Sequence, residues 1–216
     1  MKKAIVITLL VFFFATASLI AQKTISEGII KYNIQVQNSD KSNAIVDSAT
    51  VIIYLKGDLS RTDMINSLGS ETTIADIKAN SAVILKQYSG QKLMITLTKE
   101  DWKNKYDKYD GIVFQPSEET KEIAGYTCKK TTAQLKNGTT FFVYYAPDVN
   151  VINKEYEPIF KNLPGLPVQY EFTQGKLTFL YTISTVNLNP IPSSRFDVPK
   201  SGYRIMAYDD SQQKAN

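Results

Sequence analysis

The sequence predicts a mainly β protein built around one large, curved antiparallel sheet with one or two short helices. Runs in which apolar and polar residues alternate recur along most of the chain, and Gly, Asn, Ser or Lys turns separate them. Only two short segments depart from this alternation. Counting the turn-bounded runs gives roughly nine to eleven strands. A sheet of that width curls or splits, so we expect a half-barrel.

The first half of the chain carries the clearest strands. Ile30, Tyr32, Ile34 and Val36 share one face of a predicted strand, and polar residues occupy the other face. Residues 48–55 form the next strand, which becomes apolar on both faces at VIIYL. Further strands are expected at about 59–65, 71–77, 82–88 and 92–97.

Residues 98–111 (TKEDWKNKYDKYDG) interrupt the strand pattern and predict a short helix. Thr98 with Asp101 three residues later resembles a capping box. Trp102, Tyr106 and Tyr109 follow at helical spacing on one side. Two interpretations stay open: the aromatic face packs on the sheet, or it forms a lid that stacks on a ligand.

The second half returns to strands. Predicted strands at 126–136 and 139–145 flank Asn137-Gly138, a strong hairpin signal. A short helix is expected at 153–162, where Pro158 limits its length. The last strands are expected at 168–173, 176–186 and near 203–208.

The stretch LPGLP predicts a rigid corner. Pro164 and Gly165 suit the second and third positions of a type II turn, in which Gly165 has a positive φ. Leu163 and Leu166 flank the turn and can close the end of a core. Pro167 lacks a backbone donor, so the strand that follows is expected at a sheet edge.

The N-terminus has the pattern of a secretory signal peptide. Lys2 and Lys3 precede the largely apolar residues 4–21, and small residues crowd the end of that run. Cleavage is expected after Ala21, with Ala17 as the alternative; an uncleaved membrane anchor is the competing interpretation. No cysteine lies at the junction, so we expect an unlipidated periplasmic or secreted protein. Its single β domain spans 22–208, and 209–216 form a disordered tail.

The composition restricts the possible chemistry. The chain has no histidine, which removes the usual serine and cysteine triads and most zinc and copper sites. We therefore expect no enzyme, no catalytic residues, no metal and no cofactor, although carboxylate-based catalysis stays open. Glu155 and Glu157 are expected to be solvated in a turn. The net charge of +4 is dispersed, so a nucleic-acid partner is not expected.

Three ordered motifs resemble the GLPGLI family: ETKEIAGYTCKK, FFVYYAPDV and FKNLPGLPVQYEF. That family consists of exported proteins of unknown function from Bacteroidetes-type bacteria. The family positions that this chain matches are structural: Gly125, Tyr126, Cys128, Leu163, Pro164, Gly165 and Leu166. Asn162 and Pro167 replace the leading glycine and the closing isoleucine. The resemblance supplies no catalytic residues. The layout is also similar to periplasmic lipoprotein carriers, whose curved sheet holds acyl chains under helices.

Two functional hypotheses follow. In the first, the concave face binds an apolar or lipid-like ligand, lined by Trp102, Tyr106, Tyr170, Phe172, Phe179 and Tyr181. In the second, the core is full, and the protein is a cell-envelope structural or interaction module with a protein partner. Neither requires a stable membrane span after signal cleavage. Cys128 is expected to be a small buried strand residue; the alternative is a reactive thiol.

Overall fold

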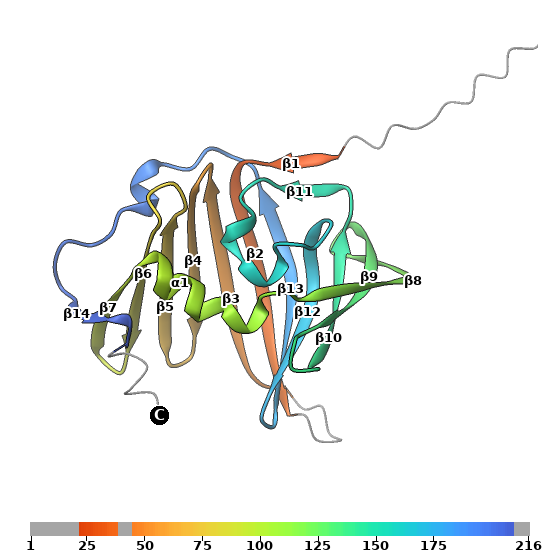
Figure 1. Ribbon diagram of the computed structural model, residues 1–216, viewed down its shortest axis with the longest axis horizontal. Coiled ribbons are helices and arrows are strands. Elements are labelled where there is room, and N and C mark those ends of the chain that lie inside the picture. Colours follow the sequence, from red (N-terminus) through yellow and green to blue (C-terminus); the bar gives the residue numbers. More distant parts are fainter. Residues whose placement is uncertain (1–21, 39–44, 210–216) are drawn as a thin grey trace, which may run out of the picture.

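The computed structural model describes residues 22–38 and 45–209. Within these ranges the chain forms one 12-stranded sheet and a separate parallel pair, β1–β11 (Figure 1). The predicted signal peptide, and all but the first residue of the predicted tail, lie outside the described residues. The strands are β1 (Lys23–Ile25), β2 (Glu27–Asn38), β3 (Ile45–Lys56), β4 (Leu59–Asn66), β5 (Gly69–Asp76), β6 (Ser81–Tyr88), β7 (Gln91–Leu97), β8 (Val113–Ile123), β9 (Tyr126–Gln134), β10 (Thr140–Ala146), β11 (Val149–Val151), β12 (Leu166–Gln174), β13 (Leu177–Asn187) and β14 (Arg204–Ala207). The helical segments are α1 (Lys99–Tyr106) and the 3-10 turns η1 (Asp107–Tyr109), η2 (Lys154–Tyr156), η3 (Pro158–Phe160) and η4 (Ser193–Phe196).

The large sheet consists of two meanders joined at one seam. Its strand order is β14-β7-β6-β5-β4-β3-β2-β13-β12-β10-β9-β8. Consecutive hairpins build β2 to β7; the chain then crosses the face of the sheet through α1 and η1 and starts again at the far edge with β8 (Figure 1). The second meander returns to the middle, where β13 pairs antiparallel with β2. The predicted curved antiparallel sheet is confirmed. One pairing departs from it, because β14 runs parallel to β7.

The main core lies on the concave face, which α1 and η1 cross. The alternation predicted for β2 is observed: Ile30, Tyr32, Ile34 and Val36 are all buried. The same face continues from β2 onto β13 and β12, because Ile34 is the cross-strand partner of Tyr181 and Tyr181 is the partner of Tyr170. The hydroxyl of Tyr32 donates a hydrogen bond of 2.6 Å to the carbonyl oxygen of Pro167.

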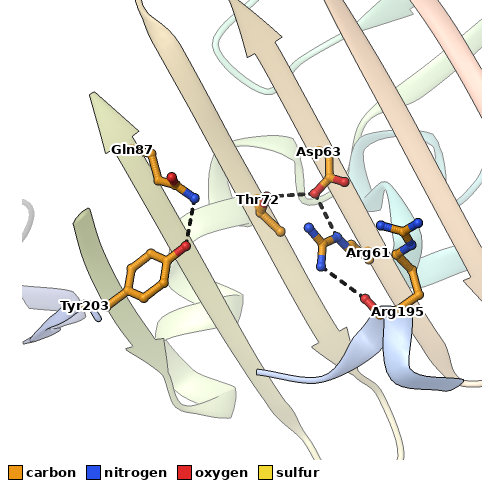
Figure 2. Close-up of polar contacts among 6 residues, drawn as sticks. All are labelled: Arg61, Asp63, Thr72, Gln87, Arg195 and Tyr203. Atoms are coloured by element: carbon orange, nitrogen blue, oxygen red, sulfur yellow. Dashed lines mark hydrogen bonds and ion pairs between the residues drawn. The ribbon is translucent and has the colours of Figure 1, made fainter. Parts of the chain in front are cut away.

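The opposite face of β4–β7 is covered by the segment that connects β13 to β14. Ile191 and Phe196 from this segment pack on Ile74, Leu85 and Met94 of the sheet. Polar contacts fix the same segment at two further points (Figure 2). The guanidinium of Arg61 donates to the carbonyl oxygen of Arg195 at 3.1 Å, and Gln87 donates to the hydroxyl of Tyr203 at 2.7 Å.

A carboxylate on β4 orients that guanidinium. Asp63 accepts hydrogen bonds from the guanidinium Nε of Arg61 at 2.8 Å and from the hydroxyl of Thr72 at 2.7 Å (Figure 2). The Arg61 side chain is thereby held between a carboxylate on its own strand and a backbone carbonyl of the covering segment. The Arg61–Asp63 pair is largely shielded from solvent, whereas the hydrogen bond from Arg61 to Arg195 is exposed.

The LPGLP corner differs from the sequence prediction in two respects. Gly165 does not have a positive φ, so the corner is not the predicted type II turn. A Cβ atom added to Gly165 would lie 2.3 Å from the carbonyl oxygen of Ala146. Glycine is therefore needed because the β10 backbone approaches closely. Leu163 and Leu166 are fully buried and close the core, as predicted.

The predicted edge position of the following strand is also wrong. β12 lies between β10 and β13 inside the sheet. Pro167 pairs with Tyr145 next to a register shift between Tyr144 and Tyr145. A bulge tolerates a residue without a backbone donor, which allows the proline in an interior strand.

The two helical predictions have different outcomes. Thr98 and Asp101 form the predicted capping box at the start of α1, since each side chain bonds the backbone of the other residue. The helix predicted over 153–162 forms instead as the separate turns η2 and η3. Glu157 lies between them with φ −145° and ψ 85°, because the residue before a proline is sterically disfavoured in the helical region.

Candidate ligand-binding cavity

A cavity of about 1000 Å³ lies between α1, the β5–β6 turn and the η2–η3 segment. Aromatic side chains form one wall: Trp102 and Tyr106 from α1, and Tyr109 from η1. Ala75 and Ala82 line it from strands β5 and β6. These small side chains leave space beside the aromatic rings, so the cavity combines an aromatic wall with an aliphatic wall.

The helix places its aromatic residues by ordinary helical spacing. The ring centroids of Trp102 and Tyr106 are 4.9 Å apart, and those of Tyr106 and Tyr109 are 6.4 Å apart. Trp102 packs against a small cluster that includes Ile84 and Ile95. No residue of α1 is fully buried. The helix therefore covers the concave face through a few partly exposed rings, and space remains beside it.

Charged residues of both signs surround the cavity. Five carboxylates and three ammonium groups line it: Asp76, Glu100, Asp107, Asp110, Glu155, Lys99, Lys103 and Lys161. Glu155 is ion-paired with Lys161, and Asp110 with Lys136 at 3.0 Å. This excess of carboxylates occurs in a chain whose net charge is +4. With Lys136 included, five carboxylates and four ammonium groups surround the cavity, so their charges nearly balance.

Glu157 is the most perturbed carboxyl near the cavity. Burial raises its pKa to about 7, and the charge of Lys105 partly opposes that shift. Within the described residues its carboxylate has no hydrogen bond and no ion pair closer than 4 Å. Burial is the main reason that five tyrosine pKa values are raised, and the charge of Glu157 contributes to each. These tyrosines are Tyr32, Tyr106, Tyr156, Tyr170 and Tyr181.

Two further polar atoms near Glu157 lack partners in the described part of the chain. The hydroxyl of Tyr156 and the Oδ1 atom of Asn153 are buried without a hydrogen bond. The amide nitrogen of Asn153 does donate to the carbonyl oxygen of Gly57, at 3.2 Å. A buried polar atom without a partner costs about 1–3 kcal/mol. These two buried atoms, at the start of the η2–η3 segment, could therefore still form hydrogen bonds.

The six predicted lining residues separate into two groups. Trp102 and Tyr106 line the cavity. Tyr170, Phe172, Phe179 and Tyr181 do not line it and belong instead to the aromatic part of the main core. Tyr170 stacks on Tyr181 with ring centroids 4.6 Å apart and an interplanar angle of 12°. Phe172 packs on Phe141 at 4.6 Å. These four rings form the floor of the concave face.

The seven family-motif residues have structural positions, and none of them lines the large cavity. Gly125 has φ +81° in the turn between β8 and β9, and Tyr126, which follows it, is half-buried. Leu163, Gly165 and Leu166 close the corner described above, with Pro164 exposed beside them.

Cys128 is a fully buried strand residue, as expected. Its thiol donates to the carbonyl oxygen of Tyr126 at 3.4 Å, and burial raises its pKa to about 11. Because the thiolate is the reactive form, we expect no reaction with a chromogenic disulfide reagent at pH 8 in folded protein. One equivalent should react after denaturation. The absorbance of the released chromophore would measure the reaction of the folded and of the denatured protein. Labelling of native protein at the same rate as free glutathione would contradict the expectation.

Within residues 22–38 and 45–209, no helix is both long and apolar enough to cross a membrane. The same part of the chain contains no group of three or more cysteine, aspartate or glutamate side chains placed to hold a metal ion.

No protein-family model matches the chain, and no curated protein matches it. Solved structures are distantly similar. Two crystal forms of PNGF-II align with TM-scores of 0.47 and 0.49 at 17% and 15% identity, covering 86% and 87% of this chain but only 33% and 34% of theirs. The chain thus spans about one third of their length. The Mycobacterium tuberculosis lipoprotein LppX aligns with a TM-score of 0.38 at 10% identity, over 76% of this chain and 88% of its own.

A third similar structure is MucB in complex with MucA(peri). It aligns with a TM-score of 0.40 at 9% identity, over 81% of this chain and 55% of its own. At such identities no residue of the cavity is transferred from any of these proteins. The resemblance to the GLPGLI family stays a prediction from the sequence motifs.

Proposed function

We propose that the protein is an exported, non-enzymatic binding protein that holds an apolar or lipid-like ligand between α1 and the sheet. The cavity of about 1000 Å³ beside Trp102, Tyr106 and Tyr109 is the observation that carries this proposal. Ligand sites are typically concave, of about 300–1000 Å³, and lined by apolar and aromatic side chains with a few polar groups. The partly exposed rings of α1 offer apolar surface that a ligand would bury.

Sequence features support the remaining parts of the proposal. The signal-peptide pattern of residues 1–21 and the motifs shared with the GLPGLI family favour export. The absence of histidine from the whole sequence favours binding over catalysis, since the commonest general base is missing.

A second candidate function is a cell-envelope interaction module without a ligand. The filled aromatic core favours it, because Tyr170, Phe172 and Tyr181 already contact each other, and Phe172 also contacts Phe141. In this case the cavity would be a surface depression beside α1, and a protein partner would use another part of the molecule.

Trp102 fluorescence separates the two functions. Trp102 is the only tryptophan, so any change in emission originates at the cavity wall. Titration with 1-decanol, an uncharged chain, should shift the emission to shorter wavelength in a saturable way, because the ligand excludes water from the indole. Isothermal titration calorimetry on the Trp102→Phe variant, which lacks the tryptophan, would test binding independently of the fluorescence signal. Unchanged emission together with no binding heat, in folded protein, would favour the interaction module.

A further inference from the structure

We propose that the ligand is an amphiphile with a long alkyl chain, and that the chain extends from the large cavity into a second, smaller cavity. This inference rests on the proposed function, because it names the shape of the ligand for the same site and the place of its apolar end. It depends on the position of the second cavity, on the chemistry of its wall and on the two residues that it shares with the large cavity.

The second cavity, of about 390 Å³, lies between the start of β8 and the LPGLP corner. Pro164 lines it from the corner, Thr131 from β9 and Tyr145 from β10. Ile112 and Asn162 line both cavities. The two cavities are therefore neighbours, and a ligand that fills the first can contact the residues at the boundary of the second.

The walls of the two cavities differ in charge. Eight charged side chains line the large cavity, whereas none of the described residues that line the second is charged. The hydroxyl of Thr131 in the second cavity already donates to the carbonyl oxygen of Gln115 at 2.8 Å. A charged or hydrogen-bonding group would lose hydration there with few partners in return, so this cavity suits an alkyl chain. Six of its eight lining residues are aliphatic, aromatic or proline: Ile112, Val113, Phe114, Pro116, Tyr145 and Pro164.

Asn162 lies on the route between the cavities. Ile112 belongs to the main core and is only 6% exposed, so its position is fixed. Asn162 follows η3 and is exposed, so its side chain can move aside without disturbing the core. A chain that runs from one cavity to the other therefore passes Asn162.

The large cavity offers the polar groups that the head of the same ligand requires. Its charged side chains are paired in part, Glu155 with Lys161 and Asp110 with Lys136 at 3.0 Å. Asn104 on α1 adds a carboxamide that can donate and accept hydrogen bonds. The ligand thus has its head group in the large cavity and the end of its chain beside β8 and the corner.

A series of 1-alkanols from six to twelve carbons tests the second cavity, because only the chain length changes. In calorimetric titrations below the solubility limit of each alcohol, the affinity of the parent protein should rise about threefold per added methylene throughout the series. Asn162→Phe places a ring at the boundary, so it should bind 1-dodecanol about tenfold more weakly than the parent does. Its affinity for 1-hexanol should be unchanged. Asn162→Leu, a smaller obstruction, should give an intermediate result.

Asn104→Phe is the matched control for the obstruction. Asn104 is also exposed, and it lines the large cavity but not the second one. The same substitution at this position should leave the dependence on chain length unchanged. Thermal denaturation would establish that the variants are folded.

A comparison of 1,10-decanediol with 1-decanol tests the orientation of the ligand. The second hydroxyl of the diol would have to enter the cavity that lacks charged residues, where its loss of hydration is poorly compensated. The diol should therefore bind more weakly than 1-decanol, and this difference should be severalfold larger in the parent than in Asn162→Phe. An equal difference in the two proteins would mean that the chain end does not enter the second cavity, and would overturn the proposal.

Two results of the alkanol series would also overturn it. An affinity that rises with chain length equally in the parent and in Asn162→Phe would exclude the second cavity and leave apolar binding in the large cavity intact. An equal loss of long-chain affinity in Asn104→Phe would show that the boundary has no special role. If no alcohol binds to the folded parent protein, the proposed function fails and this inference fails with it.

Discussion

Replacing Gly165 by alanine is expected to lower the free energy of unfolding by about 3 kcal/mol, and replacing it by valine should lower it further. The added Cβ would lie 2.3 Å from the carbonyl oxygen and 2.8 Å from the carbonyl carbon of Ala146, and 2.8 Å from the ring of Tyr145. Two of these three atoms belong to the β10 backbone, which can move only if the pairing with β12 is disturbed. Urea denaturation of the parent and variants would measure the loss.

Gly175→Ala is the matched control for this effect. Gly175 has φ +61°, and a Cβ added there meets no atom within 4 Å. Its substitution should cost about 1 kcal/mol through backbone strain alone. If Gly165→Ala denatures at the same urea concentration as the parent, the close approach of the two backbones does not exist. A loss no greater than that of Gly175→Ala would mean that the β10 backbone moves aside at little cost.

Glu157→Gln is expected to stabilise the protein at pH 8, by roughly 2 kcal/mol, and to have little effect near pH 4.5. The folded-state pKa of Glu157 is about 7, against an ordinary value of 4.5. Between these two values the folded protein holds the proton more tightly than the unfolded chain does. Stability is therefore lost as the pH rises from about 4.5 to about 7. A glutamine, which does not ionise, removes this loss.

Thermal denaturation of Glu157→Gln and parent protein at pH 4.5, 6 and 8 would measure this dependence. The expected result is a stability difference that grows with pH and becomes constant above about pH 7. Glu155→Gln is the matched control: it removes a carboxylate from the same segment that is already paired with Lys161, so it should not stabilise the protein at pH 8. A Glu157→Gln variant that is less stable than the parent at pH 8 would mean that the carboxylate has a compensating partner, for example through movement of Lys105.

Local sequence patterns were sufficient for most individual elements. Alternation located the buried face of β2, Thr98 and Asp101 located the start of α1, and Asn137-Gly138 located the β9–β10 hairpin. All three depend on residues close together in the chain. The pairings of β13 with β2 and of β14 with β7 depend on contacts far apart in sequence, and no local pattern specifies them.

Gly165 shows the same limit at a single residue. A proline–glycine pair is typical of a turn that needs a positive φ, so the sequence favoured that explanation. The actual reason for glycine is the position of the Ala146 carbonyl, which belongs to a neighbouring strand. The residue was correctly selected as structural, but its physical role could be assigned only from the tertiary arrangement.

The site was predictable in part. Helical spacing placed Trp102 and Tyr106 on one side of α1, and both line the cavity. The strand residues Tyr170 and Tyr181 were assigned to the correct face, but the rings from other elements that fill this space could not be foreseen. Phe160, for example, comes from η3 and lies 4.7 Å from the Tyr170 ring. Glu157 was missed because a glutamate before a proline resembles an exposed turn, whereas η2 and η3 fold it inward.

The seam between β2 and β13 determines when the sheet can be completed during synthesis of the chain. Each meander can form from neighbouring hairpins, but β2 lies near the start of the chain and its partner near the end, as the pairing of Ile34 with Tyr181 shows. Until β13 is available, β2 has an unpaired edge with a fully apolar face, and such an edge can pair with other chains. The chain is therefore vulnerable to aggregation until nearly its whole length has been released, and a truncation before β13 would leave that edge open permanently.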